Sequence, residues 1–481
     1  MHFNSIEFFI FLPIVFVFYW YLTPKKLSCQ NLLLLIASYI FYGYWSWKFL
    51  ILLAFSTLLD FGYGFGVASN NKRKSRLFLW LSIINNLGIL AIFKYYDFFA
   101  NQINTTLIGL GLKSSLPLLH VALPVGISFY TFHGMSYVFD IYRGLRKPVN
   151  NFIDYAVFVC FFPLLVAGPI ERANHLLPQV QNTRKFEYRV AVQGCRLMLW
   201  GLFKKVVIAD NLANIVNDIF ANYQQYNAIS LLLGAIGFSF QIYCDFSGYT
   251  DIALGTAKLF GFELLSNFKF PYFSRNIAEF WRRWHISLSS WFRDYLYIPL
   301  GGSRMGKLVS IRNILVIFLV SGFWHGANWN FIIWGGIHAC GFIPLFLSGK
   351  NKHYRDDTHN IKSRLPYPKE FMNILGTFIF VTFAWIFFRI HSIRVALAFC
   401  KKILTDSVSN PVQFLNIQSA YSIFYFIFPV LVLDWQFRHN ERELKFPANK
   451  MIRRSLYYTM IGTIIYFLLG SEQQEFIYFK F

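Results

Sequence analysis

Long runs of hydrophobic residues alternate with short polar segments along the whole chain. A helix that crosses the hydrocarbon core of a bilayer needs roughly 17 to 25 predominantly apolar residues, and most of the runs approach that length. They predict an all-α polytopic membrane protein with about 11–13 transmembrane helices. The predicted spans are residues 7–22, 30–47, 49–69, 77–97, 121–141, 190–209, 227–243, 308–323, 329–347, 371–390, 418–436 and 454–470.

The overall composition fits a protein that lies mostly in lipid. Of the 481 residues, 56% are hydrophobic and 14% are charged, whereas a soluble globular protein carries about 25% charged residues. Aromatic residues make up 20% of the chain, which suits lipid-facing surfaces and interfacial belts. Because no internal repeat or low-complexity linker divides the sequence, we expect a single membrane domain over residues 1–481.

Basic residues exceed acidic ones, and their positions indicate the topology. The chain has 45 Lys and Arg against 23 Asp and Glu, a formal net charge of +22. Basic clusters at Lys25 and Lys26, at 72–76 and at 143–147 follow the first, third and fifth spans. Since cytoplasmic loops carry an excess of Lys and Arg, we place all three clusters in the cytoplasm. The charge therefore indicates a membrane with anionic headgroups as partner, and no nucleic-acid-binding motif competes with this interpretation.

The apolar segment 155–170 is predicted not to cross the membrane. It is short, ends in a Gly-Pro pair and is followed by basic residues between 172 and 189. A re-entrant segment keeps both flanks in the cytoplasm, and irregular backbone is tolerated at membrane depth where it is buried in protein. With this choice both termini and residues 211–226 fall outside, and the basic segments 258–312, 350–369 and 437–453 fall inside.

No motif for a metal centre or a serine nucleophile occurs in the sequence. The six cysteines are scattered without a CxxC pair, and we expect them to be small buried hydrophobic residues. The histidines lack the H-x-x-H and H-E-x-x-H spacings of metal sites, and no G-x-S-x-G turn is present. The chemistry is therefore direct transfer or depends on a residue that no such motif marks.

One segment combines charge, histidine and tryptophan in a way unlike the rest of the chain. Residues 267–304 read NFKFPYFSRNIAEFWRRWHISLSSWFRDYLYIPLGGSR, and no run within them is apolar enough to cross a membrane unaided. On a single helix Trp281, His285 and Ser289 would share a face, because they are four residues apart. From spacing alone, an interfacial amphipathic helix with a tryptophan belt and a basic rim is the simpler interpretation.

A second segment places a histidine deep in the membrane. Residues 321–339 read SGFWHGANWNFIIWGGIHA. Thirteen helical residues separate His325 from Arg312 at the predicted cytoplasmic face, a rise of roughly 20 Å, and an ionisable residue at such a depth is a candidate for function. Small residues beside it permit close approach by backbone or ligand, while Trp324 and Asn328 add bulk and hydrogen-bonding capacity.

The chemistry of imidazole makes His325 a candidate catalytic base. Its unperturbed pKa lies near neutrality, which suits a group that takes a proton from a hydroxyl. A satisfied structural histidine would give the same pattern in sequence, so both interpretations stay open at this point. His338, within the apolar run that follows, is expected to be a structural hydrogen-bonding residue.

These segments resemble the membrane-bound O-acyltransferase family, in particular its bacterial branch of alginate O-acetyltransferase membrane subunits. The resemblance extends from the first span to about residue 346, and residues 121–346 are its most diagnostic part. The C-terminal third adds only generic spans. Besides 267–304 and 321–339, the matching segments are LPVGISFYTFHGMSYVFDIYRG (123–144), FPLLVAGPIER (162–172) and QIYCDFSGYTDIALG (241–255).

The resemblance implies both a fold and an activity. The fold is a helical membrane domain with re-entrant and interfacial helices around a central tunnel. The activity is acetyl transfer in the bacterial inner membrane, from acetyl-CoA or another acyl thioester on the cytoplasmic side, with no bound cofactor or metal. The family's two histidines correspond to His325 and His285, so the resemblance implies that His325 is the base and that His285 holds or polarises the donor.

Further residues around the two histidines are candidates for substrate binding. Trp324 and Asn328 belong to the turn that contains His325, and Trp281 precedes His285 by four residues. Arg282 and Arg283, near the predicted cytoplasmic entrance, would steer an anionic donor such as a coenzyme A phosphate. A solvated basic rim fits the same two arginines.

The sequence leaves the acceptor open. The first hypothesis is an O-acetyltransferase that relays acetyl groups to an exported, alginate-like polysaccharide, often through a separate extracytoplasmic acetyltransferase. The second is peptidoglycan O-acetylation or D-alanyl transfer to teichoic acid. The third is a polysaccharide transporter without bond chemistry, although the sequence offers no inverted repeat with broken helices. We favour the three in that order.

Overall fold

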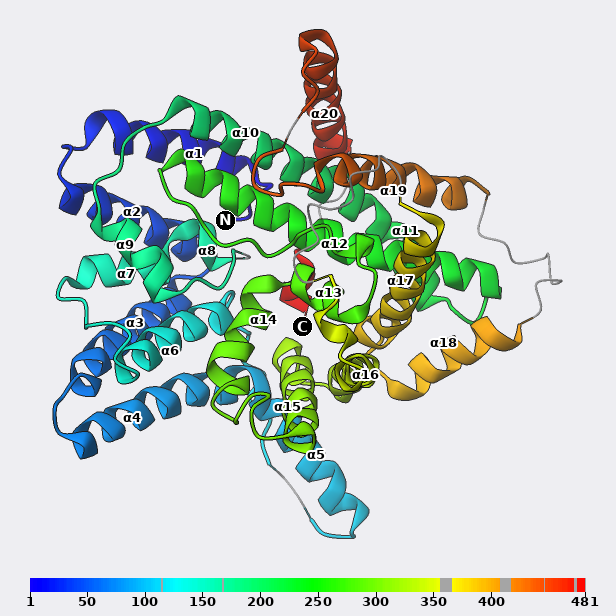
Figure 1. The fold of residues 1–481 in the computed structure, drawn as a ribbon, viewed down its shortest axis with the longest axis horizontal. Helices are drawn as coiled ribbons and strands as arrows, with labels where there is room; N and C mark the ends of the chain where they lie inside the picture. Colours follow the sequence, from blue (N-terminus) through cyan, green and yellow to red (C-terminus); the bar gives the residue numbers. More distant parts are fainter. Residues whose placement is uncertain are drawn as a thin grey trace. The chain divides into compact units, whose positions relative to one another are not determined.

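All regular structure in the described part of the chain is helical (Figure 1), which confirms the predicted all-α fold. The chain forms two compact units, one of residues 1–195 with 253–265 and one of residues 196–252 with 266–481. Residues 355–365 of the predicted cytoplasmic segment 350–369 lie outside the described residues. This computed structural model describes residues 1–113, 116–166, 168–354, 366–406, 417–444, 446–470 and 474–480.

The first unit is built from the N-terminal helices. One buried polar cluster within it is hydrogen-bonded internally: the Asp60 carboxyl group accepts hydrogen bonds from Ser82 at 2.8 Å and from Asn86 at 2.9 Å. The helices are α1 (Ile6–Val17), η1 (Phe18–Leu22), α2 (Leu27–Gly43), α3 (Trp47–Val67), α4 (Lys72–Leu90), η2 (Ala91–Tyr95), α5 (Tyr96–Gly109), α6 (Ile127–Tyr142), α7 (Phe152–Cys160), α8 (Phe162–Leu165) and α9 (Ala173–Gln181), followed by α10 (Tyr188–Leu202), which continues into the second unit.

The described part of the segment 155–170 is broken into short helices, and its predicted re-entrant course stays a prediction. Helix α7 has nine residues and α8 has four, and nine helical residues rise only about 13 Å against a hydrocarbon core of about 30 Å. Phe161 leaves the helical conformation between them. The fully buried Glu171 anchors the backbone that follows this segment. Its carboxylate accepts the amide of Leu265 at 2.6 Å, and its own backbone amide donates to His133 Nε2 at 3.0 Å. This segment therefore does not cross the bilayer as one helix.

The second unit contains the remaining helices. They are η3 (Phe203–Ala209), α11 (Asp210–Ala221), α12 (Ala228–Leu259), η4 (Pro271–Phe273), α13 (Ile277–Arg283), α14 (Ile286–Phe292), η5 (Arg293–Tyr297), α15 (Lys307–His325), α16 (Trp329–Leu347), η6 (Lys350–Lys352), α17 (Pro368–Arg389), α18 (Ile393–Thr405), α19 (Ile417–Phe437), α20 (Lys450–Gly470) and η9 (Ile477–Lys480). The end of α12 returns to the first unit.

Helix α12 is longer than the span 227–243 that the sequence predicted. The acidic residues Asp245 and Asp251 mark the end of the apolar run, yet the helix continues to Leu259. Both carboxylates are paired with lysines of η3: Lys205 Nζ lies 2.8 Å from Asp245 and Lys204 Nζ lies 2.7 Å from Asp251. Because pairing offsets the cost of burying these charges, the helix does not have to end where the apolar run ends.

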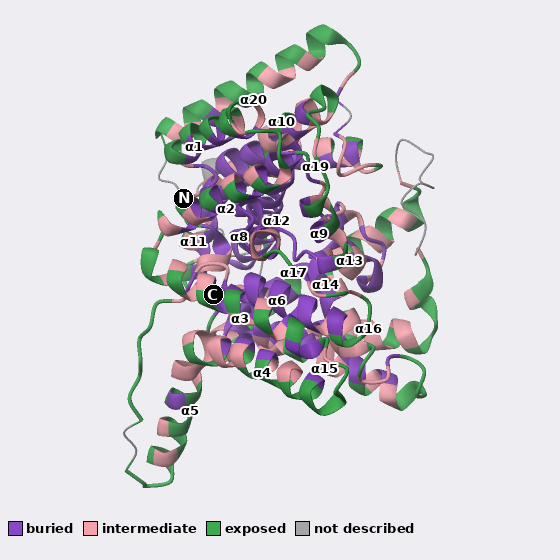
Figure 2. Ribbon diagram, turned by 90° about the vertical axis from the view of Figure 1, so that its left-hand side faces the viewer, coloured by how far each residue is buried: buried purple, intermediate pink, exposed green. Residues whose placement is uncertain are grey.

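Several helices carry the surface expected of membrane spans. In α4 the residues Leu77, Trp80, Ile84 and Leu87 form an exposed apolar stripe, which in water would be an unstable surface. Figure 2 shows α12 largely buried and α20 largely exposed. Among the described residues, six helices are long and apolar enough to cross a membrane: 47–67, 72–109, 228–259, 307–325, 329–347 and 368–389. The other predicted spans stay predictions.

Glycines bring α15 and α16 close together. A Cβ added to Gly322 of α15 would lie 2.9 Å from the carbonyl carbon of Phe331 on α16, and one added to Gly335 of α16 would lie 2.9 Å from the carbonyl carbon of Phe318 on α15. Only residues without a side chain allow this approach. The packing fixes the turn between the two helices, where His325 is found.

Candidate active site

The segment 267–304 is not one helix, so the shared face expected for Trp281, His285 and Ser289 does not form. Helix α13 ends at Arg283, and His285 has a left-handed backbone with φ 42° at the start of α14. Asn267 stabilises this break, because its carbonyl accepts the amide of Ile286 at 2.9 Å and its side chain accepts the hydroxyl of Ser287 at 2.5 Å. Backbone strain of this kind, held by surrounding hydrogen bonds, is often found at functional sites.

His325 is the last residue of α15. The next residue, Gly326, is extended, and the Asn328 side chain caps α16 by accepting the amide of Asn330 at 2.9 Å. The Asn328 amide group also donates to the carbonyl of His391 at 3.0 Å. Both ends of this amide hold the turn together, and its predicted contact with substrate stays a prediction.

The two predicted catalytic histidines lie next to each other. Their ring centroids are 6.3 Å apart, and the exposed fractions are 0% for His285 and 3% for His325. Trp324 contacts both, with its ring 5.9 Å from His285 and 5.0 Å from His325. Residues that are forty positions apart in sequence thus form one buried pair, beside the tryptophan expected to accompany them.

Aromatic rings enclose the two imidazoles. Trp334 of α16 and Phe388 of α17 lie 5.1 and 5.3 Å from the His325 ring, both edge-on. Phe246 of α12 lies 4.8 Å from the His285 ring. Such walls exclude water from a reaction centre.

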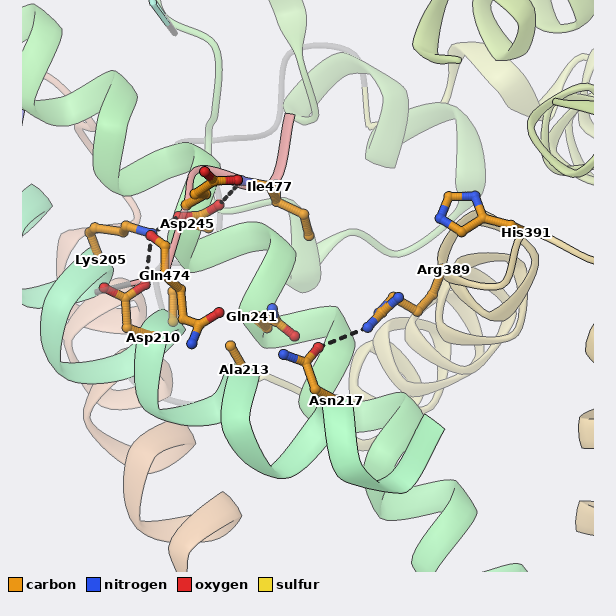
Figure 3. A pocket seen from close by; sticks show the side chains of 12 residues that line it. Lys205, Asp210, Ala213, Asn217, Gln241, Asp245, Arg389, His391, Gln474 and Ile477 are labelled. Atoms are coloured by element: carbon orange, nitrogen blue, oxygen red, sulfur yellow. Dashed lines mark hydrogen bonds and ion pairs between the residues drawn. The ribbon is translucent and has the colours of Figure 1, made fainter. Parts of the chain in front are cut away.

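The segment 474–479 contributes a ring that sequence analysis missed. Tyr478 lies 5.6 Å from the His325 ring and 6.3 Å from the His285 ring. The segment is attached through its backbone: the amide of Ile477 donates to Asp245 at 2.6 Å, and Lys205 donates to the carbonyl of Gln474 at 2.9 Å (Figure 3). The C-terminal third, which looked generic in sequence, therefore completes the surroundings of both histidines.

Trp281 contacts the surroundings of His325 indirectly, through His338 and Trp334. Its indole N–H donates to Nδ1 of His338 at 3.3 Å, and its ring lies 5.7 Å from Trp334, which in turn contacts His325. His338 is fully buried and stacks on Phe280 with an interplanar angle of 3°. These contacts agree with the structural role expected for His338.

The two arginines have different surroundings. Arg283 is buried and its guanidinium lies 2.7 Å from the Glu279 carboxylate, so its charge is already offset. Arg282 donates to the carbonyls of Asn351 and His353, both at 3.0 Å, in the loop after α16. Both arginines were expected to steer an anionic donor. That role stays a prediction.

Comparison with known proteins relates the chain to one family. The membrane-bound O-acyltransferase family matches residues 142–350, which include both histidines. A probable alginate O-acetylase, AlgI, of Pseudomonas aeruginosa is 40% identical over 395 residues, covering 82% of this chain and 72% of the relative. The chain belongs to the membrane-bound O-acyltransferase family. It is therefore an O-acyltransferase and a multi-pass protein of the bacterial membrane.

Two other relatives show the range of acceptors in the family. The peptidoglycan O-acetyltransferase of Helicobacter pylori is 34% identical over 519 residues, covering 98% of this chain and 96% of that protein. The teichoic acid D-alanyltransferase of Bacillus subtilis is 32% identical over 243 residues, covering 48% of this chain and 61% of that protein. The O-acetylating relatives thus match far more of the chain than the D-alanylating one.

The buried environment fixes the charge state of His285. This residue lies outside the helices that can span a membrane, and burial lowers the pKa of its imidazole to about 3. It is therefore neutral at physiological pH, with one nitrogen that donates and one that accepts a hydrogen bond. In this O-acyltransferase a neutral imidazole beside His325 is suited to orient a polar group of a substrate. Among the described residues, no group of three or more His, Cys, Asp or Glu could hold a metal ion.

Proposed function

We propose that this chain is a membrane O-acetyltransferase that takes an acetyl group from a cytoplasmic thioester and passes it across the membrane to an exported cell-surface polysaccharide. The observation that carries the proposal is the buried pair of His285 and His325, with ring centroids 6.3 Å apart, in a chain of this family. Two imidazoles side by side provide one group for the acceptor hydroxyl and one for the donor.

In the proposed reaction His325 is the general base. The acceptor oxygen attacks the thioester carbonyl carbon while the imidazole takes the hydroxyl proton. A C–O bond forms, the C–S bond breaks, and the thiol leaves with a proton. General base catalysis of this kind contributes typically 10²–10⁴-fold. His285 holds or polarises the thioester carbonyl, and the aromatic walls limit wasteful hydrolysis. The donor is acetyl-CoA or an acylated carrier.

The acceptor is proposed from the relatives. Those named alginate O-acetylase share the higher identity with this chain, which favours an alginate-like polysaccharide. The peptidoglycan O-acetyltransferase matches almost the whole chain, so peptidoglycan is the second candidate acceptor. D-alanyl transfer has less support, because the relative with that activity matches about half of the chain. As in the first hypothesis, we expect an extracytoplasmic acetyltransferase as a partner protein.

Mass spectrometry of cell-envelope glycans tests the proposal. A deletion strain is complemented with the wild-type gene, with His325→Ala or with His338→Ala, and protein levels are measured in isolated membranes. We expect the wild type to restore O-acetyl groups on the exported polysaccharide and His325→Ala to restore none at an equal protein level. His338 is an equally buried imidazole, so His338→Ala controls for the loss of a ring as such and should retain most of the transfer.

The same measurement separates the candidates. If the deletion strain lacks O-acetyl groups on muramic acid rather than on an exopolysaccharide, peptidoglycan is the acceptor. Near-normal acetylation in the His325→Ala strain, with no second copy of the enzyme present, would overturn the assignment of His325 as the general base.

A further inference from the structure

Helix α18 follows α17, one of the helices that are long and apolar enough to cross a membrane (Figure 1). The 13 residues of α18 rise only about 20 Å, which is too short for a hydrocarbon core of about 30 Å. Residues 390–392 alone separate the two helices, and the charge rule places this end of α17 on the extracytoplasmic side. Helix α18 therefore begins at the outer surface of the membrane.

The turn between α17 and α18 is attached to residues that follow His325. The Asn330 side chain donates to the carbonyl of Ile390 at 2.6 Å, and the Asn328 side chain donates to the carbonyl of His391 at 3.0 Å. Both acceptors are backbone carbonyls, so moving the start of α18 away from the end of α17 would break both hydrogen bonds. The fold thus holds α18 at the level where the chain leaves the membrane.

One face of α18 packs on α11. Phe399 stacks on Phe220 of α11 with ring centroids 4.8 Å apart and an interplanar angle of 18°. Lys402 donates to the carbonyl of Gln224, in the loop that follows α11. Ala396 is also fully buried. These contacts determine which face of α18 remains uncovered.

The apolar arc of α18 is wider than the part that the protein covers. At about 100° per residue, its apolar side chains occupy about 200° of the helix circumference, from Val395 to Leu397. Phe399, within this arc, is fully buried, whereas Leu397 and Leu404 at its far edge are 55% and 85% exposed. The two leucines are seven residues apart, so they lie on one line along the helix. A continuous apolar edge of α18 is thus exposed.

Two cations border this apolar edge. Arg394 and Lys401 are exposed, and they lie about 60° around the helix from Leu397 and Leu404. Helix α18 contains no Asp or Glu that could offset their charge. The charge rule favours Lys and Arg on the cytoplasmic side, so it does not account for basic residues in an extracytoplasmic helix. An apolar edge beside a basic edge is typical of a helix that lies in the headgroup layer of a membrane.

We propose that α18 lies in the plane of the extracytoplasmic headgroup layer and binds anionic phospholipid there. Leu397 and Leu404 insert into the boundary with the acyl chains, while Arg394 and Lys401 bind lipid phosphates and lay their aliphatic stems along the apolar surface. Each cation close to an anionic surface strengthens such binding about fivefold. The inference does not depend on the proposed donor, acceptor or catalytic base.

Fluorescence quenching in lipid nanodiscs tests the position of α18. A coumarin-bearing amino acid is placed at position 404 or 405 of the full-length chain, and spin-labelled acyl chains in the nanodisc are the quencher. Thr405 is the matched control, because it is exposed and lies about 100° from Leu404, on the basic side of the helix. In nanodiscs of phosphatidylethanolamine with phosphatidylglycerol, we expect strong quenching at 404 and weak quenching at 405.

The selection of anionic lipid is measured as the ratio of lipid-inserted to water-exposed probe at 404. At low ionic strength, Lys401→Gln should lower this ratio about fivefold with phosphatidylglycerol present and leave it unchanged in phosphatidylethanolamine alone. Lys113→Gln removes an exposed cation elsewhere on the predicted extracytoplasmic side and should have no effect.

Two results would overturn the proposal. A probe at 404 that is as accessible to water as one at 405 would assign this face of α18 to a protein or polysaccharide partner instead. Equal insertion with and without phosphatidylglycerol, or an equal loss in Lys113→Gln, would refute the binding of anionic lipid by Arg394 and Lys401. Because the measurement needs neither donor nor acceptor, it is independent of the acetylation test.

Discussion

The close packing of α15 and α16 predicts that one methyl group at Gly322 will disturb the catalytic turn. An alanine Cβ there would overlap most with the carbonyl oxygen of Phe331, and it would lie 2.9 Å from the carbonyl carbon of Phe331 and 3.3 Å from the Cα of Ile332. All three are backbone atoms and cannot move aside as a side chain could. Carbon atoms in ordinary contact are about 3.5–4.0 Å apart, so the carbonyl carbon alone requires the helices to separate by roughly 0.5–1 Å.

The magnitude follows from two opposing effects. Replacing a helical glycine by alanine stabilises a helix by about 0.8–1.0 kcal/mol, whereas overpacking a tight interface costs typically about 1–3 kcal/mol. Gly336 on α16 is a matched control, because its Cβ would meet only Leu319 Cδ2 at an ordinary 3.9 Å. The helix-propensity gain is common to both positions. We therefore expect Gly322→Ala to be less stable than Gly336→Ala by about 1–3 kcal/mol.

The effect on turnover should exceed the effect on stability. Gly322 lies three residues before His325 on the same helix, and a misplacement of about 1 Å can cost about 10²-fold in rate. The assay is the apparent melting temperature of the purified protein, followed by tryptophan fluorescence, together with acetyl transfer per mole of protein. If Gly322→Ala melts and turns over like Gly336→Ala, the close contact of α15 and α16 does not fix the catalytic turn.

Three further predictions follow from the structure. Lys205→Met leaves two buried aspartates without their partner and should destabilise the protein by about 3–5 kcal/mol, measured as a loss of the folded fraction in detergent. Tyr478→Ala opens a space beside both histidines and should lower acetyl transfer at unchanged protein level in membranes. Cysteines placed in residues 72–76 should resist labelling from outside intact cells, and a reporter at Thr183 should read cytoplasmic; an outside signal at either position would reverse the topology.

The sequence predicts the helical membrane fold and the two histidines, but not how the fold brings the two histidines together. Hydrophobic run length depends only on local composition, so spans such as α15 and α16 are found almost at their observed bounds. The resemblance to the family indicated His285 and His325. The distance of 6.3 Å between their ring centroids depends on the tertiary structure and cannot be derived from sequence spacing. The periodicity argument failed at His285, because hydrogen bonds that Asn267 accepts from Ile286 and Ser287 stabilise a break that no spacing rule marks.

The extent of α12 shows why composition alone gives the wrong end for a buried span. A charge inside an apolar run indicates the end of a helix when its partner is unknown. Asp245 and Asp251 are tolerated because Lys205 and Lys204, from a separate segment, pair with them. Lys204 and Lys205 were assigned to the span 190–209 without a role. A pair of adjacent lysines inside one predicted span, together with two aspartates just after another, was the available signal for this contact.

The contribution of the segment 474–479 was beyond sequence reasoning for a specific physical reason. Lys205 and Asp245 bind its backbone carbonyl and amide rather than its side chains. Almost any residue offers these backbone groups, so the attached segment itself carries no recognisable sequence pattern. Only Lys205 and Asp245, the charged residues that bind it, could be noticed in the sequence. Burying such a cluster costs free energy that apolar packing would not. We infer that Lys205 and Asp245 compensate for this cost by holding Tyr478 against the two histidines.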